Sequence, residues 1–238
     1  MASIDTGKVR RIGMIFRKDG RTLISALDHG GEDALITGIE HISEVIRKVV
    51  QGGVDAILIN EGILEKIGGT IESRVPIILN IPLMGGFVKN AISLGAEAVK
   101  TTYFGEVPIS IPVAEKMREV AMEAREYGVP YFNEYVPMES GNLSFDPILI
   151  ARAARAAAEY GADVVKTSYT EKFEIVTSAV PVPVIIAGGP PDKDIFSAMR
   201  AVIKKGGAGG AIGRSIFQSK NQEEVIRELV KIVHGDSI

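Results

Sequence analysis

One lysine, Lys166, interrupts a run of branched and apolar residues at 164–169, and hydroxyl residues follow it. A helix-like segment that stops at Gly161 precedes this run, so the sequence predicts a strand entered from a helix. A lysine at the carboxyl end of such a strand points into a half-buried space, where burial disfavours the charged ammonium form. An unprotonated amine is a nucleophile that forms a Schiff base with a ketone, whereas a solvated lysine at a strand tip would do no chemistry.

The same pattern occurs a second time, because residues 95–103 (GAEAVKTTY) match residues 161–169 (GADVVKTSY). The two copies lie two strand–helix units apart, which places Lys100 and Lys166 on alternate strands. In a closed barrel, alternate strands contribute side chains to the same layer, so we expect both lysines to project inward at one level. Two ammonium groups in one site disfavour each other's charge, which makes Lys100 a candidate for tuning Lys166. The alternative is a simple repeat with both lysines solvated.

Strand-like and helix-like segments alternate at a spacing of roughly 30 residues, which is typical of a (β/α)8 barrel. The expected strands are residues 23–30, 55–60, 76–80, 98–103, 130–135, 164–169, 182–189 and 210–214. We therefore expect an α/β fold, a single TIM-barrel domain over residues 1–238. Residues 1–21 would form an N-terminal helical extension that plugs the amino-terminal end of the barrel; a phosphate-binding arm is the less favoured interpretation.

An open doubly wound sheet is the alternative fold, and it would normally show a glycine fingerprint after the first strand. Here Asp28 and His29 stand at that place instead. The sequence therefore favours the closed barrel.

The composition narrows the classes of function. The chain has 238 residues, 46% of them hydrophobic, and 27 Lys and Arg against 30 Asp and Glu give a formal net charge of −3. This balance argues against nucleic acid and anionic membranes as partners. Without cysteine there is neither a disulfide framework nor a thiolate metal site. No apolar run is long enough to span a membrane and no signal segment is evident, so we expect a cytoplasmic protein.

Barrel chemistry lies at the carboxyl ends of the strands. The polar residues expected there are Asp28, His29, Asn60, Glu61, Asn80, Lys100, Asn133, Glu134, Tyr135, Lys166 and Tyr169. Gly188 and Gly189 follow the seventh strand, and Gly213 and Arg214 follow the eighth. Glycines let the backbone approach an oxyanion closely, the dipole of the following helix favours it, and Arg214 adds positive charge. These four residues therefore predict a phosphate site.

Four segments together carry a resemblance to a known family: residues 27–30 (LDHG), 165–170 (VKTSYT), 187–190 (AGGP) and 212–218 (IGRSIFQ). The chain resembles the archaeal-type class I fructose-bisphosphate aldolases. It is also similar to their relatives, the 2-amino-3,7-dideoxy-heptulosonate synthases and the thiolase that acts on autoinducer-2 phosphate. The resemblance implies that Lys166 is the Schiff-base lysine and Asp28 the aspartate beside it. It also implies that Gly188, Gly189, Gly213 and Arg214 hold a phosphate.

The chain departs from that family after the fifth strand. The aldolases and synthases present Tyr-Pro-Arg there, where the tyrosine is the acid/base and the arginine holds a second phosphate. Here Val136 occupies the place of the tyrosine and Met138 that of the arginine. Strand alternation turns Tyr135 away from the site unless a bulge intervenes. Glu134 shares the face of Val136 and is therefore a candidate substitute, and Lys100 is not part of the family pattern.

These observations predict a Schiff-base lyase or transferase that makes or breaks a carbon–carbon bond in a phosphorylated keto-sugar. The expected catalytic residues are Lys166, Asp28, Glu134 and Lys100; the expected phosphate- and substrate-binding residues are His29, Gly188, Gly189, Gly213 and Arg214. We expect a homo-oligomer that needs no cofactor. We also expect no metal site, since the three histidines are scattered along the sequence. His29 could orient substrate or cap its strand, and His41 and His234 are expected at the surface.

Three other functions stay open at this point. One is an isomerase that uses Glu134 as base with Lys100 or Lys166 as an electrostatic partner. Another is a thiolase or transaldolase of the same superfamily. The third is a non-catalytic protein that keeps the phosphate cradle.

Overall fold

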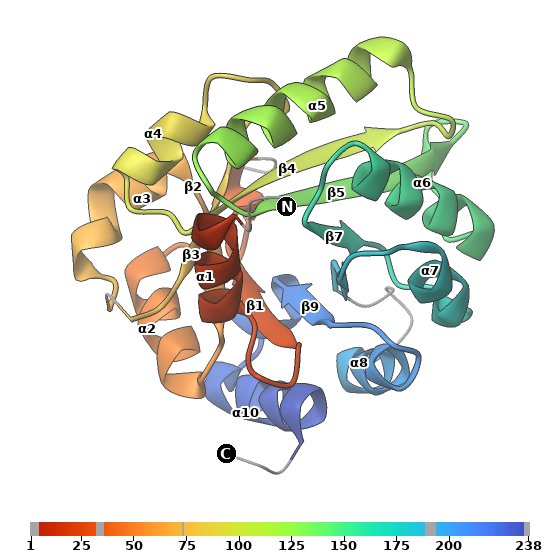
Figure 1. The fold of residues 1–238 in the computed structure, drawn as a ribbon. Helices are drawn as coiled ribbons and strands as arrows, with labels where there is room; N and C mark the ends of the chain where they lie inside the picture. Colours follow the sequence, from red (N-terminus) through yellow and green to blue (C-terminus); the bar gives the residue numbers. More distant parts are fainter. Residues whose placement is uncertain (1–4, 32–35, 73, 189–193, 236–238) are drawn as a thin grey trace.

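The computed structural model describes residues 5–31, 36–72, 74–188 and 194–235. Within these residues eight parallel strands close into a barrel (Figure 1). The barrel strands are β1 (Thr22–Ala26), β2 (Ala56–Asn60), β3 (Ile77–Asn80), β4 (Ala98–Gly105), β5 (Tyr131–Glu139), β7 (Val164–Thr167), β8 (Val184–Ile186) and β9 (Gly209–Ile212). They follow one another around the barrel in chain order, and β1 pairs with β9 to close it. The expected (β/α)8 fold is confirmed.

Helices surround this barrel and bury one face each against it (Figure 1). They are α2 (Ile42–Gly52), α3 (Glu61–Ile67), α4 (Val88–Ser93), α5 (Ile111–Glu126), α6 (Pro147–Glu159), α7 (Phe173–Ala179), α8 (Ile195–Lys204) and α10 (Gln222–His234), with a short α9 (Arg214–Phe217) and two 3-10 turns, η1 (His29–Gly31) and η2 (Gly68–Thr70). The start of α6 shows why the sequence folds this way. Asp146 accepts hydrogen bonds from the backbone N–H groups of Ile148 and Leu149, and Pro147 fills the first helical position.

On one side of the barrel, a hairpin formed by β5 and the short strand that follows it extends beyond the carboxyl ends of the other strands. β5 continues past the cavity and turns back through Ser140 and Gly141, both with positive φ, into the antiparallel β6 (Asn142–Leu143). Positive φ at both positions of a two-residue turn matches the twist of a tight hairpin. The neighbouring strand β4 is also long, so this part of the wall is made of paired backbone instead of a free loop.

The amino-terminal end of the barrel is plugged by the first helix, α1 (Thr6–Ile15), which crosses it in Figure 1. Ile15 and Phe16 are buried in one cluster with inward-facing residues of the barrel, among them Leu58 and Phe132. The rings of Phe16 and Phe132 stack with their centroids 6.5 Å apart. The expected N-terminal helical extension and its position are therefore confirmed.

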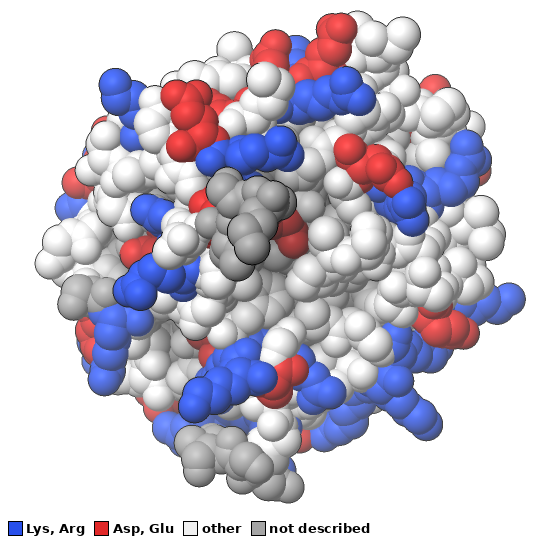
Figure 2. Space-filling model, viewed as in Figure 1, with Lys and Arg blue, Asp and Glu red and all other residues white. Residues whose placement is uncertain are grey.

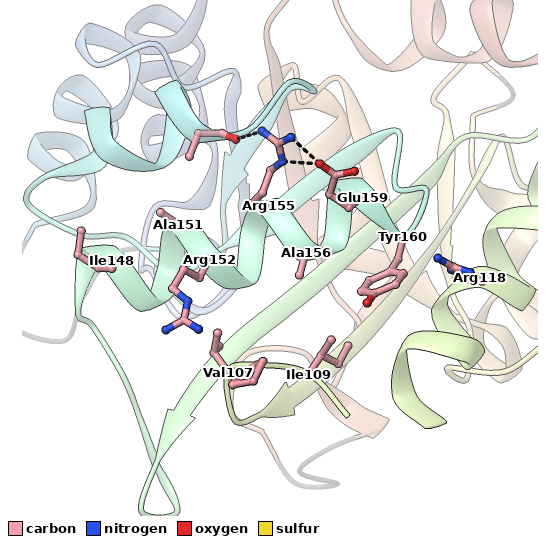
Figure 3. Close-up of a pocket in the computed structure, with 12 residues that line it drawn as sticks. Val107, Ile109, Arg118, Ile148, Ala151, Arg152, Arg155, Ala156, Glu159 and Tyr160 are labelled. Atoms are coloured by element: carbon pink, nitrogen blue, oxygen red, sulfur yellow. Dashed lines mark hydrogen bonds and ion pairs between the residues drawn. The ribbon is translucent and has the colours of Figure 1, made fainter. Parts of the chain in front are cut away.

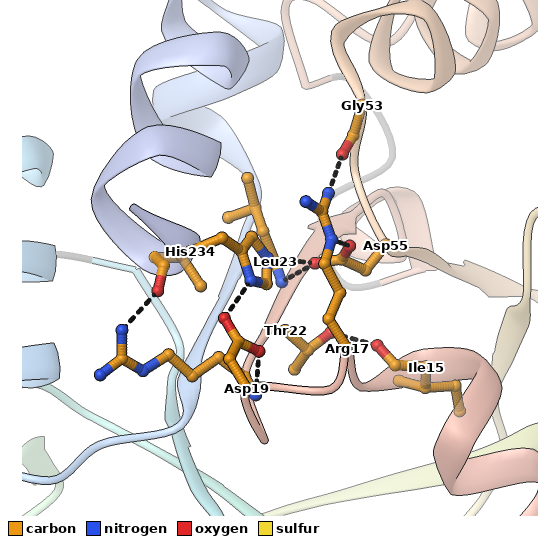
Figure 4. Close-up of polar contacts among 10 residues, drawn as sticks. Ile15, Arg17, Asp19, Thr22, Leu23, Gly53, Asp55 and His234 are labelled. Atoms are coloured by element: carbon orange, nitrogen blue, oxygen red, sulfur yellow. Dashed lines mark hydrogen bonds and ion pairs between the residues drawn. The ribbon is translucent and has the colours of Figure 1, made fainter. Parts of the chain in front are cut away.

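Carboxylates at this end tie the strands to the N-terminal segment (Figure 4). Asp55 accepts the backbone N–H of Leu23 at 2.6 Å and pairs with Arg17 Nε at 2.5 Å. Asp163 accepts the backbone N–H of Tyr131 at 2.9 Å and pairs with Lys8 Nζ at 2.7 Å. Each carboxylate thus joins two strands and the extension.

His234 lies in the same network, and the prediction that it is a surface residue is wrong. Its ring nitrogens lie 2.7 Å from Asp19 Oδ2 and 2.9 Å from Asp55 Oδ2, and its side chain is 2% exposed. The end of α10 is therefore fastened to the segment that enters β1 (Figure 4). His41, in contrast, is exposed at the start of α2.

Figure 2 shows the same end of the molecule with its charges. Lys and Arg side chains lie there beside Asp and Glu side chains, with broad areas of uncharged residues between them. No helix among the described residues is long and apolar enough to cross a membrane.

Candidate active site

A cavity of about 360 Å³ opens at the carboxyl end of the barrel. Its lining includes most of the residues that the sequence singled out: Asp28, His29, Lys100, Glu134, Lys166, Gly188, Gly213 and Arg214, together with Ala26, Ile36, Phe104, Val136, Leu143, Ser168, Ala187, Ala211 and Ser215. Gly189 lies outside the described residues. The described parts of the chain hold no group of three or more His, Cys, Asp or Glu side chains placed to bind a metal ion.

Strand alternation and register bring the charged residues together. Lys100 lies on β4, Glu134 on β5 and Lys166 on β7, and Glu134 is the register partner of Lys166. Side chains two residues apart share a face, so Phe132, Glu134 and Val136 all point inward. Both lysines reach the cavity, as the repeated segment led us to expect.

A chain of four charges runs across this end of the barrel. Lys166 Nζ lies 2.9 Å from each oxygen of Glu134. Lys100 Nζ lies 2.9 Å from Glu134 Oε2 and 3.0 Å from Asp28 Oδ2. Two ammonium groups thus alternate with two carboxylates, and the cluster is neutral as a whole.

The carboxylates of this cluster stay ionised. Burial raises the pKa of Glu134, but the attraction of Lys166 and Lys100 outweighs it and lowers that pKa to about 2. Burial likewise raises the pKa of Asp28, and the same two lysines bring it below its usual value. Thr102, which was not predicted as a site residue, donates a further hydrogen bond from Oγ1 to Glu134 at 3.2 Å. Its position two residues after Lys100 on one strand is the signal that could have identified it.

Lys100 and Lys166 have different surroundings although their segments are alike. Lys100 is 1% exposed and bridges two carboxylates. Burial lowers its pKa, but Glu134 and Asp28 more than reverse this, so the pKa of Lys100 is raised above its usual value. Lys166 is 6% exposed and contacts one carboxylate, Glu134. Lys100 is therefore held as an ammonium group between two carboxylates, whereas Lys166 has one carboxylate partner and a larger exposed fraction.

The opposite side of the cavity can receive an anion. Gly188 has φ of +91°, a conformation that favours glycine. A Cβ at Gly213 would lie 2.2 Å from His29 Cε1, so this position has no room for a side chain. Arg214 is exposed and has no carboxylate partner among the described residues. Helix α9 has only four residues, so the positive charge of Arg214, more than a helix dipole, would attract the anion.

His29 lies between the charged cluster and this anion side. Its Nδ1 is 3.8 Å from Asp28 Oδ1, and its ring packs edge-on against Phe217 with centroids 5.4 Å apart. It lines the cavity, so of the two roles left open by the sequence, contact with substrate agrees with its position.

Tyr135, which lies within β5, does not reach the cavity. β4 and β5 pair without interruption from Val99 opposite Tyr131 to Gly105 opposite Pro137, so no bulge turns Tyr135 inward. Tyr135 packs against Tyr103 outside the barrel and donates to the carbonyl of Glu106. Burial, with the nearby Tyr103, raises its pKa to about 12. Val136 lines the cavity in its place, which leaves Glu134 as the acid/base candidate on this strand.

The remaining polar residues near the strand ends either hold the backbone of the site, pack outside the barrel or line the cavity. Asn60 donates to the backbone carbonyl of Asp28 at 2.6 Å, and Asn80 donates to Asn60 at 2.8 Å. Asn133 bonds to the hydroxyl of Tyr131 outside the barrel, and Tyr169 is buried in the outer core. Ser168 and Ser215 line the cavity and were not predicted.

A larger hollow of about 720 Å³ lies outside the barrel, between α5, α6 and the segment that follows β4 (Figure 3). Its charged residues serve local structure: Arg155 bonds to Glu159 and to the carbonyl of Ala179, and Arg118 lies 5.3 Å from the ring centre of Tyr160. It holds no buried lysine or carboxylate, so the barrel cavity is the better candidate for chemistry.

Comparison with known proteins agrees with this geometry. The chain is 29% identical to the 2-amino-3,7-dideoxy-D-threo-hept-6-ulosonate synthase 1 of Archaeoglobus fulgidus, covering 97% of this chain and 92% of the relative. It is 30% identical to the synthase of the same name from Halobacterium salinarum, covering 98% and 94%.

Among solved structures, it is similar to an archaeal fructose-1,6-bisphosphate aldolase whose catalytic lysine is covalently bound to a carbinolamine intermediate. The TM-score is 0.82 at 26% identity, covering 95% of this chain and 99% of that one. Residues 22–219 match the family described as DeoC/LacD family aldolase, and this match contains every strand of the barrel. The chain therefore belongs to the DeoC/LacD family of aldolases.

Proposed function

We propose that this protein is a Schiff-base aldolase that cleaves or forms a carbon–carbon bond in a phosphorylated keto-sugar, with Lys166 as the nucleophile. The observation that carries the proposal is the contact of Lys166 Nζ with both oxygens of Glu134, in a cavity whose other side presents Arg214. The archaeal aldolase with a lysine-bound carbinolamine has the same fold, which supports the covalent route.

The first half of the reaction would join substrate to enzyme. Glu134 accepts a proton from the Lys166 ammonium, and its basicity rises as that positive charge disappears. The free amine attacks the substrate carbonyl to give a carbinolamine. Protonation of the carbinolamine hydroxyl by Glu134 releases water and leaves an iminium ion on Lys166.

The second half would break the carbon–carbon bond. Asp28 or Glu134 removes the proton from the substrate hydroxyl, an aldehyde leaves, and the electron pair of the broken bond moves into the iminium to form an enamine. Protonation of the enamine and hydrolysis release the ketone and restore Lys166. Because the iminium accepts the electron pair, the proposed route needs no metal ion. Lys100 stays charged throughout and holds Asp28 and Glu134 in place.

A transaldolase reaction is the second candidate. The two curated relatives carry the name of a heptulosonate synthase, and Val136 replaces the tyrosine that the family resemblance leads one to expect. Such a reaction would share the Lys166 iminium and would pass the enamine to a second carbonyl compound before hydrolysis. The two candidates therefore differ in the acceptor and agree on the nucleophile.

The test is reduction with borohydride in the presence of dihydroxyacetone phosphate and a panel of other phosphorylated ketones. Reduction fixes an iminium as a stable secondary amine, so the intact protein should gain the mass of the ketone less one oxygen. Inorganic phosphate, which cannot form an iminium, is the control. A ketone that is turned over without any trapped protein would contradict the proposal.

A further inference from the structure

The two sides of the cavity differ in chemistry. Ser168, Gly188, Gly213, Arg214 and Ser215 come from the loops after β7, β8 and β9 and make one side polar. The other side is built from large apolar residues, Phe104, Val136 and Leu143, on β4, β5 and β6. In a barrel of eight strands, β4 lies across from β9, so a molecule bound between the two sides meets both.

The apolar side is fixed in place by backbone pairing. Phe104 and Val136 are register partners on β4 and β5, and Leu143 pairs with Met138 in the hairpin. Yet Phe104 is 47% exposed and Leu143 is 49% exposed. Two large apolar side chains held at the mouth of a cavity, with half their surface in water, are a binding surface that is complete only when an apolar group covers them.

The charged side chains in the described lining of the cavity leave one cation, Arg214, available to bind an anionic group of the substrate. Asp28 and Glu134 neutralise Lys100 and Lys166, so Arg214 is the cation in the described lining that remains unpaired. A second phosphate near Phe104 and Leu143 would contact apolar carbon and lose its hydration without compensation. Apart from Lys100, Lys166 and Arg214, the described lining of this cavity contains no lysine or arginine that could hold a second phosphate.

We infer that the natural substrate carries a single phosphate and that the aldehyde half of the carbon–carbon bond is apolar, an alkyl or aryl aldehyde. This inference rests on the proposed function and narrows it: the ketone half carries the hydroxyl and phosphate groups of a keto-sugar, and the aldehyde half carries no further hydroxyl groups. The ketone half binds its phosphate beside Arg214 and forms the iminium with Lys166, and the aldehyde half extends toward Phe104, Val136 and Leu143. Cleavage gives one phosphorylated ketone and one apolar aldehyde, and condensation in the other direction joins the same two molecules, so neither an oxidant nor a reductant is involved.

The experiment measures condensation in the presence of a phosphorylated ketone already shown to be trapped by borohydride, starting with dihydroxyacetone phosphate. The acceptors are benzaldehyde, butanal and glyceraldehyde 3-phosphate, compared by kcat/KM. We expect both apolar aldehydes to exceed glyceraldehyde 3-phosphate by at least about tenfold. A preference for glyceraldehyde 3-phosphate overturns the inference and leaves the proposed function standing, whereas absence of trapping with every phosphorylated ketone ends both.

Variants of the apolar side test whether the aldehyde half of the substrate binds there. Leu143→Asn and Phe104→Asn should each lower kcat/KM for benzaldehyde by about tenfold, which corresponds to the loss of one half-buried apolar side chain. Ile148→Asn, at an equally exposed apolar residue outside this cavity, is the matched control and should keep the preference. If Leu143→Asn and Phe104→Asn instead leave the preference intact and change the oligomeric state in light scattering, the surface contacts a second copy of the chain and the inference is wrong.

Discussion

The two ends of the barrel hold ion pairs of different construction. At the amino-terminal end, Asp55 and Asp163 each bond to the backbone of one strand and to a cation of the N-terminal segment. At the carboxyl end, Asp28 and Glu134 have Lys100 and Lys166 as their ion-pair partners, and all four line a cavity.

This difference distinguishes ion pairs that attach the N-terminal segment to the barrel from ion pairs that line a cavity. The carboxylates at the amino-terminal end join segments that are distant in the chain, and their loss should affect unfolding. The charges at the carboxyl end lie on β4, β5 and β7 and just after β1, on strands that backbone pairing already holds in the barrel. They attach no separate segment to the barrel, and a buried charged cluster in an open cavity points to function.

The largest expected effect is at Lys100. Lys100→Met leaves Asp28 and Glu134 buried without their shared cation, which should cost about 3–5 kcal/mol of unfolding free energy. It also removes a positive charge that opposes the ammonium form of Lys166, so the pH optimum of turnover should rise by about one unit. The measurements are denaturant unfolding and a pH profile of kcat/KM.

Lys8→Met is the matched control for that variant, because Lys8 pairs with Asp163 at the other end of the barrel. It should lower stability less, since its pair is partly exposed, and should leave the pH profile as in the wild type. An equal shift of the pH optimum in both variants would remove the distinction between the two ends.

The pH dependence of stability sharpens the comparison. The pKa of Glu134 is lowered from 4.5 to about 2 in the folded protein. Its contribution to the unfolding free energy is therefore present above pH 4.5 and is lost as the pH falls from 4.5 toward 2. A shift of this size corresponds to roughly 3 kcal/mol. Glu134→Gln should remove this part of the acid-induced loss of stability, as measured by denaturant unfolding at a series of pH values. An identical acid dependence in the variant would show that Glu134 is not held as a carboxylate.

Arg214 should affect binding more than stability. Arg214→Ala removes the unpaired cation from the anion side of the cavity. The loss of a charged hydrogen bond worth about 1.5–3 kcal/mol should raise KM for a phosphorylated substrate about 10- to 150-fold. Steady-state kinetics with a phosphorylated substrate and its unphosphorylated analogue measure the effect. The analogue should be unaffected, and an unchanged KM for every phosphorylated substrate would place the anion elsewhere.

The smallest effect is expected at the amino-terminal end. Asp55→Asn weakens the contacts to Arg17 and His234 and should cost about 1–3 kcal/mol of unfolding free energy. Turnover per folded molecule at neutral pH should stay as in the wild type. A loss of turnover without a loss of stability would mean that this end contributes to the chemistry.

The barrel could be predicted because its signals are local. Most strands begin with a short apolar run, and several helices end at a glycine or begin at a cap, as with Asp146 and Pro147. The inward position of Lys100 and Lys166 followed from the repeated segment and from alternation. The hairpin at 139–143 was not predicted. Pro137 is a residue that usually ends a strand, so nothing in the sequence indicated that β5 continues to the turn at Ser140 and Gly141.

The contacts within the site could not be predicted, because they depend on register between distant segments. The sequence suggests that the two lysines repel each other, whereas the pairing of β4, β5 and β7 places Glu134 between them. The burial of His234 likewise depends on how α10 packs over the segment entering β1. The short α9 after Gly213 gives the anion side less of a helix dipole than the sequence suggested.

The central claim is that Lys166 reacts while Lys100 remains a fixed charge, and mapping of the trapped adduct tests it most directly. The protein is reduced with borohydride in the presence of dihydroxyacetone phosphate, digested, and the modified peptide is sequenced by mass spectrometry. We predict that the modification lies on Lys166 and is absent from Lys166→Met. A modification on Lys100 would contradict this account of the site.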